Sequence, residues 1–156
     1  MTAVEMLVRA LAKKKMTCAT AESCTGGGVG YAITSVPGAS AVFRGGIVSY
    51  DNQVKRDILG VPETVLETQG AVSSECARAM ADGARRLLGA DFAVSLTGIA
   101  GPGGGSAGKP VGLVWFGLSC PGGVVAEQKV FLGDRDAVRA SAIEHAIAML
   151  LSAATD

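Results

Sequence analysis

The sequence has few aromatic residues, one histidine and no excess of either charge. Aromatic side chains make up 4% of the 156 residues, and fourteen basic residues balance fourteen acidic ones. A nucleic-acid-binding surface needs a basic excess, so this composition argues against a nucleic-acid partner. The four cysteines form no C-x-x-C pair, which together with the single histidine argues against a zinc site. We therefore expect neither a metal nor a cofactor.

Long apolar runs are also missing, so neither a membrane span nor a membrane partner is expected. Cysteines without a pairing pattern are typical of free thiols, which indicates the cytoplasm. With 49% hydrophobic residues the chain can form one domain, residues 1–156, around a full core. Because glycine and alanine are abundant while aromatics are scarce, we expect close packing of small residues, and we expect a homodimer.

Apolar periodicity and capping residues predict alternating helices and strands. Thr2 and Glu5 form a capping box at the start of the first helix, and Ser73 or Ser74 opens the most regular one. Strands are expected at 16–20, 47–50, 92–96, 111–118 and 124–132. Helices are expected at 3–15, after residue 27, at 52–59, 62–70 and 74–88, and from Asp134 or Asp136 onward. This order predicts a three-layer α/β/α sandwich with a mixed, mostly parallel sheet, since the last two strands form a hairpin.

The stretch Ala21–Gly28 lies between a predicted strand and a predicted helix. The first N–H groups of a helix have no partner within it, and glycines let a ligand approach them closely. Ser23 could therefore be a nucleophile whose developing negative charge is held by free N–H groups. The alternative is that Ser23 or Thr25 simply caps the helix, which is the commoner role of such residues.

A nucleophilic Ser23 needs a base, and the chain offers few. His145 lies inside the last predicted helix among apolar residues, which argues against a Ser–His–Asp triad. Lys55 can act as a base if its pKa falls below its usual value of about 10.4, and Tyr50 can relay a proton. The alternatives are a solvated Lys55 and a half-buried strand residue at position 50. Sequence spacing does not decide between them.

The glycine-rich loop contains two nucleotide-binding patterns that lack their structural context. Gly103–Gly108 matches G-x-G-x-x-G, and with Lys109 it approaches a P-loop. Both motifs must open a helix, but this segment leads through Pro110 into a predicted strand. We interpret it as a loop that approaches a ligand, with a mobile surface loop as the alternative.

Several motifs together resemble the CinA C-terminal domain family, the nicotinamide-nucleotide amidases of the PncC type. The matching stretches, which follow one another over nearly the whole chain, are Ala21-Glu22-Ser23-Cys24-Thr25-Gly26-Gly27, Tyr50-x-Asn52-x-x-Lys55, Gly70-Ala71-Val72-Ser73, Gly98-Ile99-Ala100-Gly101-Pro102-x-Gly104-Gly105, Lys109-Pro110-Val111-Gly112-x-Val114-Trp115 and Gly133-Asp134-Arg135-x-x-x-Arg139. The resemblance implies hydrolysis of nicotinamide mononucleotide, a pyridine nucleotide, to nicotinate mononucleotide and ammonia, which feeds NAD salvage. It also implies a three-layer α/β/α domain and a serine–lysine–tyrosine site without metal.

The resemblance assigns roles to individual residues. Ser23 becomes the nucleophile, Lys55 the base and Tyr50 the proton relay, while Arg135 or Arg139 holds the substrate phosphate. Glu22 is expected to orient Lys55 or a substrate hydroxyl. The remaining expected substrate contacts are Thr25, Gly26 and Gly27, whose N–H groups would hold the oxyanion, and Asn52, Gly101, Gly104 and Gly105.

Some features leave alternatives open. Gly28 stands where many relatives have a bulkier residue, and Cys24 is a rival nucleophile beside Ser23. Larger relatives carry an additional N-terminal domain linked to competence and a pyrophosphatase activity; because this chain begins at the amidase-like domain, those functions are not expected here. The chain could instead be a catalytically silent regulatory domain, or bind a phosphorylated ligand through Gly98–Lys109.

Overall fold

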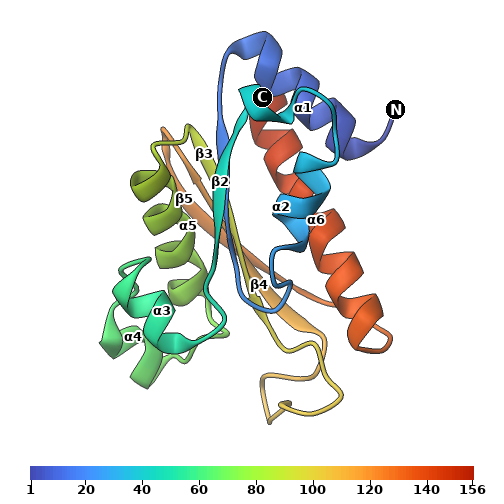
Figure 1. Cartoon of the computed structure of the whole chain (residues 1–156). Coiled ribbons are helices and arrows are strands. Elements are labelled where there is room, and N and C mark those ends of the chain that lie inside the picture. Colours follow the sequence, from blue (N-terminus) through green and yellow to red (C-terminus); the bar gives the residue numbers. More distant parts are fainter.

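The computed structural model describes all residues from Met1 to Asp156. A five-stranded sheet forms the middle layer, with helices on both faces (Figure 1). The elements in chain order are α1 (Ala3–Lys14), β1 (Cys18–Glu22), α2 (Gly28–Thr34), a short 3₁₀ helix (Ala39–Ala41), β2 (Phe43–Val48), α3 (Asn52–Asp57), α4 (Glu63–Thr68), α5 (Ser74–Leu88), β3 (Phe92–Gly98), β4 (Leu113–Cys120), β5 (Gly123–Val130) and α6 (Arg135–Thr155).

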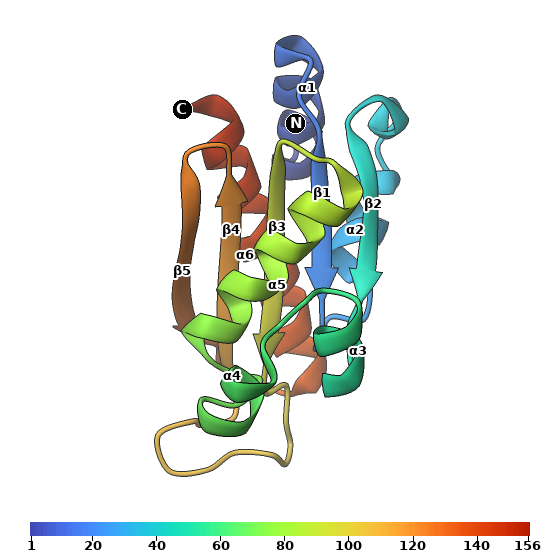
Figure 2. The same ribbon diagram turned by 90° about the vertical axis from the view of Figure 1, so that its left-hand side faces the viewer.

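The strand order in the sheet is β2-β1-β3-β4-β5. β1 pairs in parallel with β2 and β3, whereas β4 runs antiparallel to both β3 and β5. Only β4 therefore points the other way (Figure 2), which confirms a mixed, mostly parallel sheet. The register pairs Glu22 with both Val48 and Leu96. The three parallel strands thus end side by side, the position where ligands bind in open α/β sheets.

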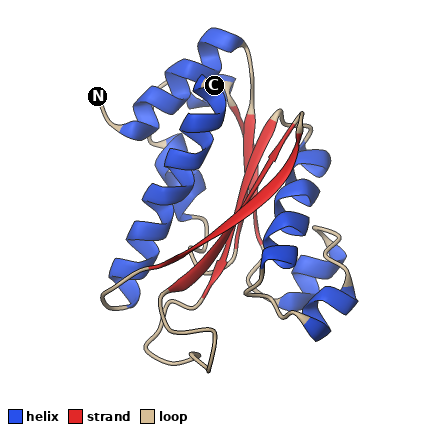
Figure 3. Cartoon of the chain, turned by 180° about the vertical axis from the view of Figure 1, so that it is seen from behind, coloured by secondary structure: helices blue, strands red, loops and turns tan.

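Two layers of helices cover the sheet (Figure 3). α1, α2 and α6 cover one face and enclose the larger core, which includes Leu11, Ile33 and Phe116. α5 covers the other face over a smaller core. A Cβ added at Gly117 of β4 would collide with the carbonyl oxygen of Ala77 in α5, so this helix lies very close to the sheet. The expectation of close packing between small residues is confirmed here.

The predicted helix caps are present. Thr2 and Glu5 form the capping box of α1, Ser73 caps α5 by accepting from the Cys76 N–H, and Asp134 caps α6. Side-chain oxygens at these positions bind N–H groups that have no partner within the helix. The caps explain why the helix starts could be predicted from the sequence closely.

Several strand boundaries were wrong. β1 ends at Glu22 instead of residue 20, and β2 covers 43–48 instead of 47–50. Gly46 lies inside β2, where a Cβ would collide with the Thr20 hydroxyl oxygen. The hairpin strands are likewise 113–120 and 123–130. As a result Glu22 belongs to a strand, and Tyr50 follows one.

α6 corrects the expectation that no segment approaches the length of a membrane span. By length and composition alone this 21-residue helix could cross a membrane. It packs instead along β3, β4 and α1, and Val138, Ala142, Ala146 and Leu150 are buried in the larger core. Its apolar composition follows from that packing.

Candidate active site

A pocket of about 280 Å³ opens at the carboxyl ends of β1, β2 and β3. Four segments and the start of α6 form its wall. Its lining residues are Ser23 and Cys24 after β1; Tyr50, Asn52 and Lys55 after β2; Ala71 and Val72 before α5; Thr97, Gly98, Ile99, Ala100, Gly101, Gly103 and Gly104 at the end of β3; and Arg135. Residues from across the chain are therefore gathered at one end of the sheet.

The turn at Ser23 is held by its own backbone. The Ser23 N–H donates to the Leu96 carbonyl (3.0 Å), and the Ser23 carbonyl accepts from the Gly26 N–H (3.1 Å). Gly26 and Gly27 have φ angles of 60° and 102°, which favour glycine. The Gly26 N–H is therefore engaged within the turn, whereas the Thr25 and Gly27 N–H groups have no acceptor in the chain.

Glu22 caps α2, a role that the sequence analysis had offered to Ser23 or Thr25. Its buried carboxylate accepts from the N–H groups of Val29 (2.8 Å) and Gly30 (3.1 Å) and from the Thr25 hydroxyl (2.6 Å). It makes no contact with Lys55 and does not line the pocket. Glu22 therefore supports the Ser23 turn and the start of α2, and it does not orient Lys55.

Lys55 and Ser23 are joined by a hydrogen bond. The Lys55 Nζ donates to the Ser23 Oγ (3.1 Å) and to the Tyr50 carbonyl oxygen (2.9 Å). Lys55 is 1% exposed, so the interpretation as a solvated cation is wrong. Burial lowers the pKa of Lys55 below its ordinary value, and no carboxylate forms an ion pair with it. A buried amine in this state can accept a proton from the serine hydroxyl.

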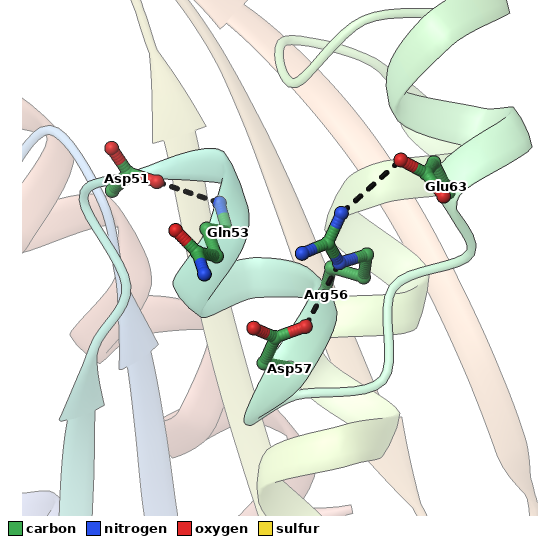
Figure 4. Close-up of polar contacts among 5 residues, drawn as sticks. All are labelled: Asp51, Gln53, Arg56, Asp57 and Glu63. Carbon is green, nitrogen blue, oxygen red and sulfur yellow. Dashed lines mark hydrogen bonds and ion pairs between the residues drawn. The ribbon is translucent and has the colours of Figure 1, made fainter.

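Polar contacts along α3 fix the helix that carries Lys55 (Figure 4). Asp51 caps its first turn. Arg56 forms ion pairs with Asp57 (2.8 Å) and with Glu63 at the start of α4 (3.1 Å). These pairs are largely exposed and each contributes little to stability. Only the Arg56–Glu63 pair links α3 to α4, and Lys55 is the buried residue of α3.

Tyr50 and Asn52 line the pocket but contact neither Ser23 nor Lys55 through their side chains. Tyr50 is 64% exposed, and its hydroxyl has no hydrogen-bond partner in the chain. Its backbone carbonyl, which the sequence analysis did not consider, is the group that touches Lys55. The phenol is therefore free to contact a ligand at the mouth of the pocket.

The two arginines of α6 lie in different places. Arg135 lines the pocket and donates to the Gly101 carbonyl (2.9 Å). Arg139, one turn later, donates through Nε to the Cys24 carbonyl (3.0 Å) and through Nη2 to the Thr25 carbonyl (3.4 Å). Arg139 thus binds carbonyls of the Ser23 turn, and Arg135 lines the cavity.

The glycine loop forms one rim of the pocket, and it leads into β4 without a helix, as expected. Gly101 and Gly104 line the cavity, whereas Gly105 packs against Val111 outside it. Lys109 closes the loop by donating to the Gln69 carbonyl. Only part of the expected glycine set therefore reaches the site.

One wall of the pocket consists of residues for which no role was predicted from the sequence. Thr97 at the end of β3 donates its hydroxyl to the Ala71 carbonyl (2.9 Å) and so fixes the segment before α5. Ala71, Val72 and Ile99 complete this apolar wall. The motif around Ala71 was noticed, but its side chains carry no chemistry that would have singled them out.

Two other reactive side chains are poorly suited to catalysis here. Burial raises the pKa of the Cys24 thiol to about 11, so it is protonated at neutral pH. His145 lies outside the pocket, bonded to Glu127 (2.6 Å) and packed against the Phe116 ring (4.5 Å between centroids). No three His, Cys, Asp or Glu side chains lie together in an arrangement that could hold a metal ion.

Comparisons with known proteins agree on one family. The model of the CinA C-terminal domain matches residues 1–154. A CinA-like protein from Synechococcus sp. (strain RCC307) is 48% identical over 148 residues, which are 93% of this chain and 35% of that protein. A CinA-like protein from Leptospira borgpetersenii is 58% identical over 114 residues, 73% of this chain and 27% of that protein. The chain thus spans about a third of the length of these curated relatives.

Solved structures match over nearly their whole length. A CinA superfamily protein from Klebsiella pneumoniae 700603 has a TM-score of 0.94 at 35% identity, covering 98% of this chain and 96% of that one. The competence/damage inducible protein CihA from Agrobacterium tumefaciens has a TM-score of 0.91 at 41% identity, covering 100% and 98%. These likenesses extend to the whole three-layer arrangement.

The capping role of Glu22 gives a stability prediction. Glu22→Gln should lower the free energy of unfolding by roughly 1–3 kcal/mol, because an amide nitrogen cannot accept and leaves a buried donor unpaired. Urea denaturation measures this, with Glu67→Gln, an exposed carboxylate of α4, as the control. Equal denaturation midpoints for both variants would contradict the capping role.

Proposed function

The chain belongs to the CinA C-terminal domain family, and on this premise we propose that it hydrolyses the carboxamide of nicotinamide mononucleotide. The products would be nicotinate mononucleotide and ammonia, in the cytoplasm and in the service of NAD salvage. The observation that carries the proposal is the hydrogen bond between the buried Lys55 amine and the Ser23 hydroxyl inside a pocket. A serine activated by a neighbouring base is the arrangement that nucleophilic amide hydrolysis requires.

The proposed reaction uses Ser23 as nucleophile and Lys55 as base. Neutral Lys55 takes the Ser23 proton while the Oγ attacks the carboxamide carbon, which forms a tetrahedral oxyanion. The N–H groups of Thr25 and Gly27, which have no acceptor in the chain, are assigned as donors to that oxyanion. Collapse breaks the C–N bond, and the proton held by Lys55 leaves with the nitrogen as ammonia. Lys55 then deprotonates a water that hydrolyses the Ser23 ester and releases nicotinate mononucleotide.

Other pocket residues would bind the nucleotide. The exposed Tyr50 hydroxyl stands free at the pocket mouth, and we assign it the relay of the Lys55 proton to the leaving nitrogen. Arg135 is the cation that faces the cavity, so it is assigned to the phosphate, with Asn52 and the Gly101–Gly104 backbone beside it. Arg139 is assigned to the nucleophile turn, because its guanidinium is bonded to the Cys24 and Thr25 carbonyls.

A catalytically silent domain is the alternative, since the relatives' names speak only of CinA and of competence and damage induction. Burying a lysine without a carboxylate partner costs stability. A purely structural domain gains nothing from that cost, whereas an amidase gains a base. The buried lysine without a carboxylate partner therefore favours the enzyme over the silent domain. Wild-type protein that released no ammonia from nicotinamide mononucleotide would favour the silent domain.

Single substitutions can distinguish Ser23 from Cys24 as the nucleophile. Ser23→Ala should lower kcat for ammonia release by about 10³-fold or more, since nucleophile loss disables the whole catalytic unit. Cys24→Ala should keep most activity, because the protonated thiol takes no part. A coupled ammonia assay measures both, with melting temperature as the folding control. An active Ser23→Ala beside an inactive Cys24→Ala would make this a thiol enzyme.

The lowered pKa of Lys55 predicts a pH dependence of activity and of stability in the wild type that Lys55→Met lacks. The folded-state pKa is lowered, so kcat/KM should rise with pH along a limb whose midpoint lies below the ordinary value of 10.5. Between the two pKa values the unfolded chain binds more protons, so wild-type stability rises with pH through that window. Lys55→Met, which does not titrate, should lose turnover and be relatively more stable at low pH.

Lys55→Arg is the matched control for charge, since it stays protonated. It should be nearly as inactive as Lys55→Met. Substantial activity in Lys55→Arg would contradict a role as base and leave Lys55 as an electrostatic contact.

The two arginines should affect different kinetic parameters. Arg135→Ala should raise KM for nicotinamide mononucleotide roughly 10- to 100-fold, the effect of losing a charged hydrogen bond. The same substitution should leave the KM for nicotinamide riboside unchanged, because that substrate lacks the phosphate. Arg139→Ala should lower kcat for both substrates because it loosens the Ser23 turn. Steady-state kinetics distinguishes these results, and a phosphate-specific KM effect in Arg139→Ala would reverse the assignments.

A further inference from the structure

β5 is an outer strand of the sheet, and one of its sides has no strand partner (Figure 2). It is eight residues long, as is β4, and it stands on the far side of β4 from the three parallel strands. A free strand edge of this length presents unpaired N–H and C=O groups that can pair with another strand. None of its residues lines the Ser23 pocket.

Apolar side chains are exposed along this edge. Val125, Val130 and Leu132 are 57%, 56% and 89% exposed, although they lie within eight positions of one another. Val125 also borders a hollow of about 630 Å³ between the hairpin and the second half of α6, where Leu118 and Met149 form part of a mainly apolar wall. Exposed apolar surface of this kind commonly marks an interaction site.

The charges on β5 select both the partner and the register. Glu127 and Lys129 lie two residues apart, so they share one face of the strand. When two copies of β5 pair antiparallel around a two-fold axis at Gln128, Glu127 of each copy lies opposite Lys129 of the other. An axis at Glu127 or at Lys129 places two like charges opposite each other, which is unfavourable. The strand is therefore complementary to itself in the Gln128 register.

We propose that the chain forms a symmetric homodimer through antiparallel pairing of its β5 strands centred on Gln128. In this register Val130 of each copy lies opposite Ala126 of the other, and Val125 lies opposite Phe131, so the exposed apolar side chains are covered. The same surface meets itself on both copies, as a two-fold interface requires. The two hollows beside α6 flank the joined sheet, which continues through both protomers.

Charge reversal tests the interface in the full chain by sedimentation velocity. Wild-type protein should be a dimer, and Lys129→Glu should weaken the dimer about tenfold or more, since both opposed pairs become repulsive. The exposed Lys129 side chain forms no ion pair within the protomer, so this variant should fold normally. Glu67→Lys on α4 is the matched control, and its dimer should be unchanged.

The double variant Glu127→Lys with Lys129→Glu decides the register. It restores opposite charges across the axis and should recover the wild-type dimerisation constant, while Glu127→Lys alone should be weakened like Lys129→Glu. Circular dichroism checks folding, because Glu127 also binds His145. A monomeric wild type at 100-fold above assay concentration, a dimer indifferent to Lys129→Glu, or a double variant that stays weakened would each overturn the proposal.

Discussion

The burial of one amine governs the arrangement of the site. Lys55 is enclosed where β2, α3 and the segment before α5 meet, and only the Ser23 hydroxyl and the Tyr50 carbonyl bond to its nitrogen. Removing an ammonium group from water without a carboxylate partner disfavours its charged form. The same desolvation that lowers stability favours the neutral amine, which can accept a proton. α3, which carries Lys55, is capped by Asp51 and linked to α4 by the Arg56–Glu63 ion pair.

The serine that faces this amine lies on a turn held by two charged side chains. Glu22 binds N–H groups of α2 from inside the sheet, and Arg139 binds carbonyls of the turn from α6. Each of these side chains is bonded to backbone groups of the turn or of α2. Sites on rigidly supported segments hold their reactive groups more accurately than free loops do. Arg135, which donates to the Gly101 carbonyl, lines the pocket along with Tyr50.

Local rules predicted much of the fold, and long-range contacts decided the rest. Thr2, Ser73 and Asp134 could be predicted as caps because a cap depends on a few neighbouring residues. Gly46 lies inside β2 although the strand was expected to begin at residue 47, and only the neighbouring Thr20 side chain explains why a glycine is needed there. The burial of Lys55 and the capping by Glu22 likewise depend on residues that spacing does not reveal. The resemblance did not distinguish the two arginines, whereas the structure places Arg135 in the pocket wall and bonds Arg139 to the Ser23 turn.

The sheet order divides the molecule into two parts with different constraints. The ends of β1, β2 and β3 supply the pocket, and their register must keep Ser23 within hydrogen-bond reach of Lys55. β5 lies beyond β4 and supplies no pocket residue. A change along the β5 edge can therefore alter association without moving the serine or the lysine. Since His145 ties β5 to α6 far from the Ser23 turn, the site and the edge share a scaffold but no side chain.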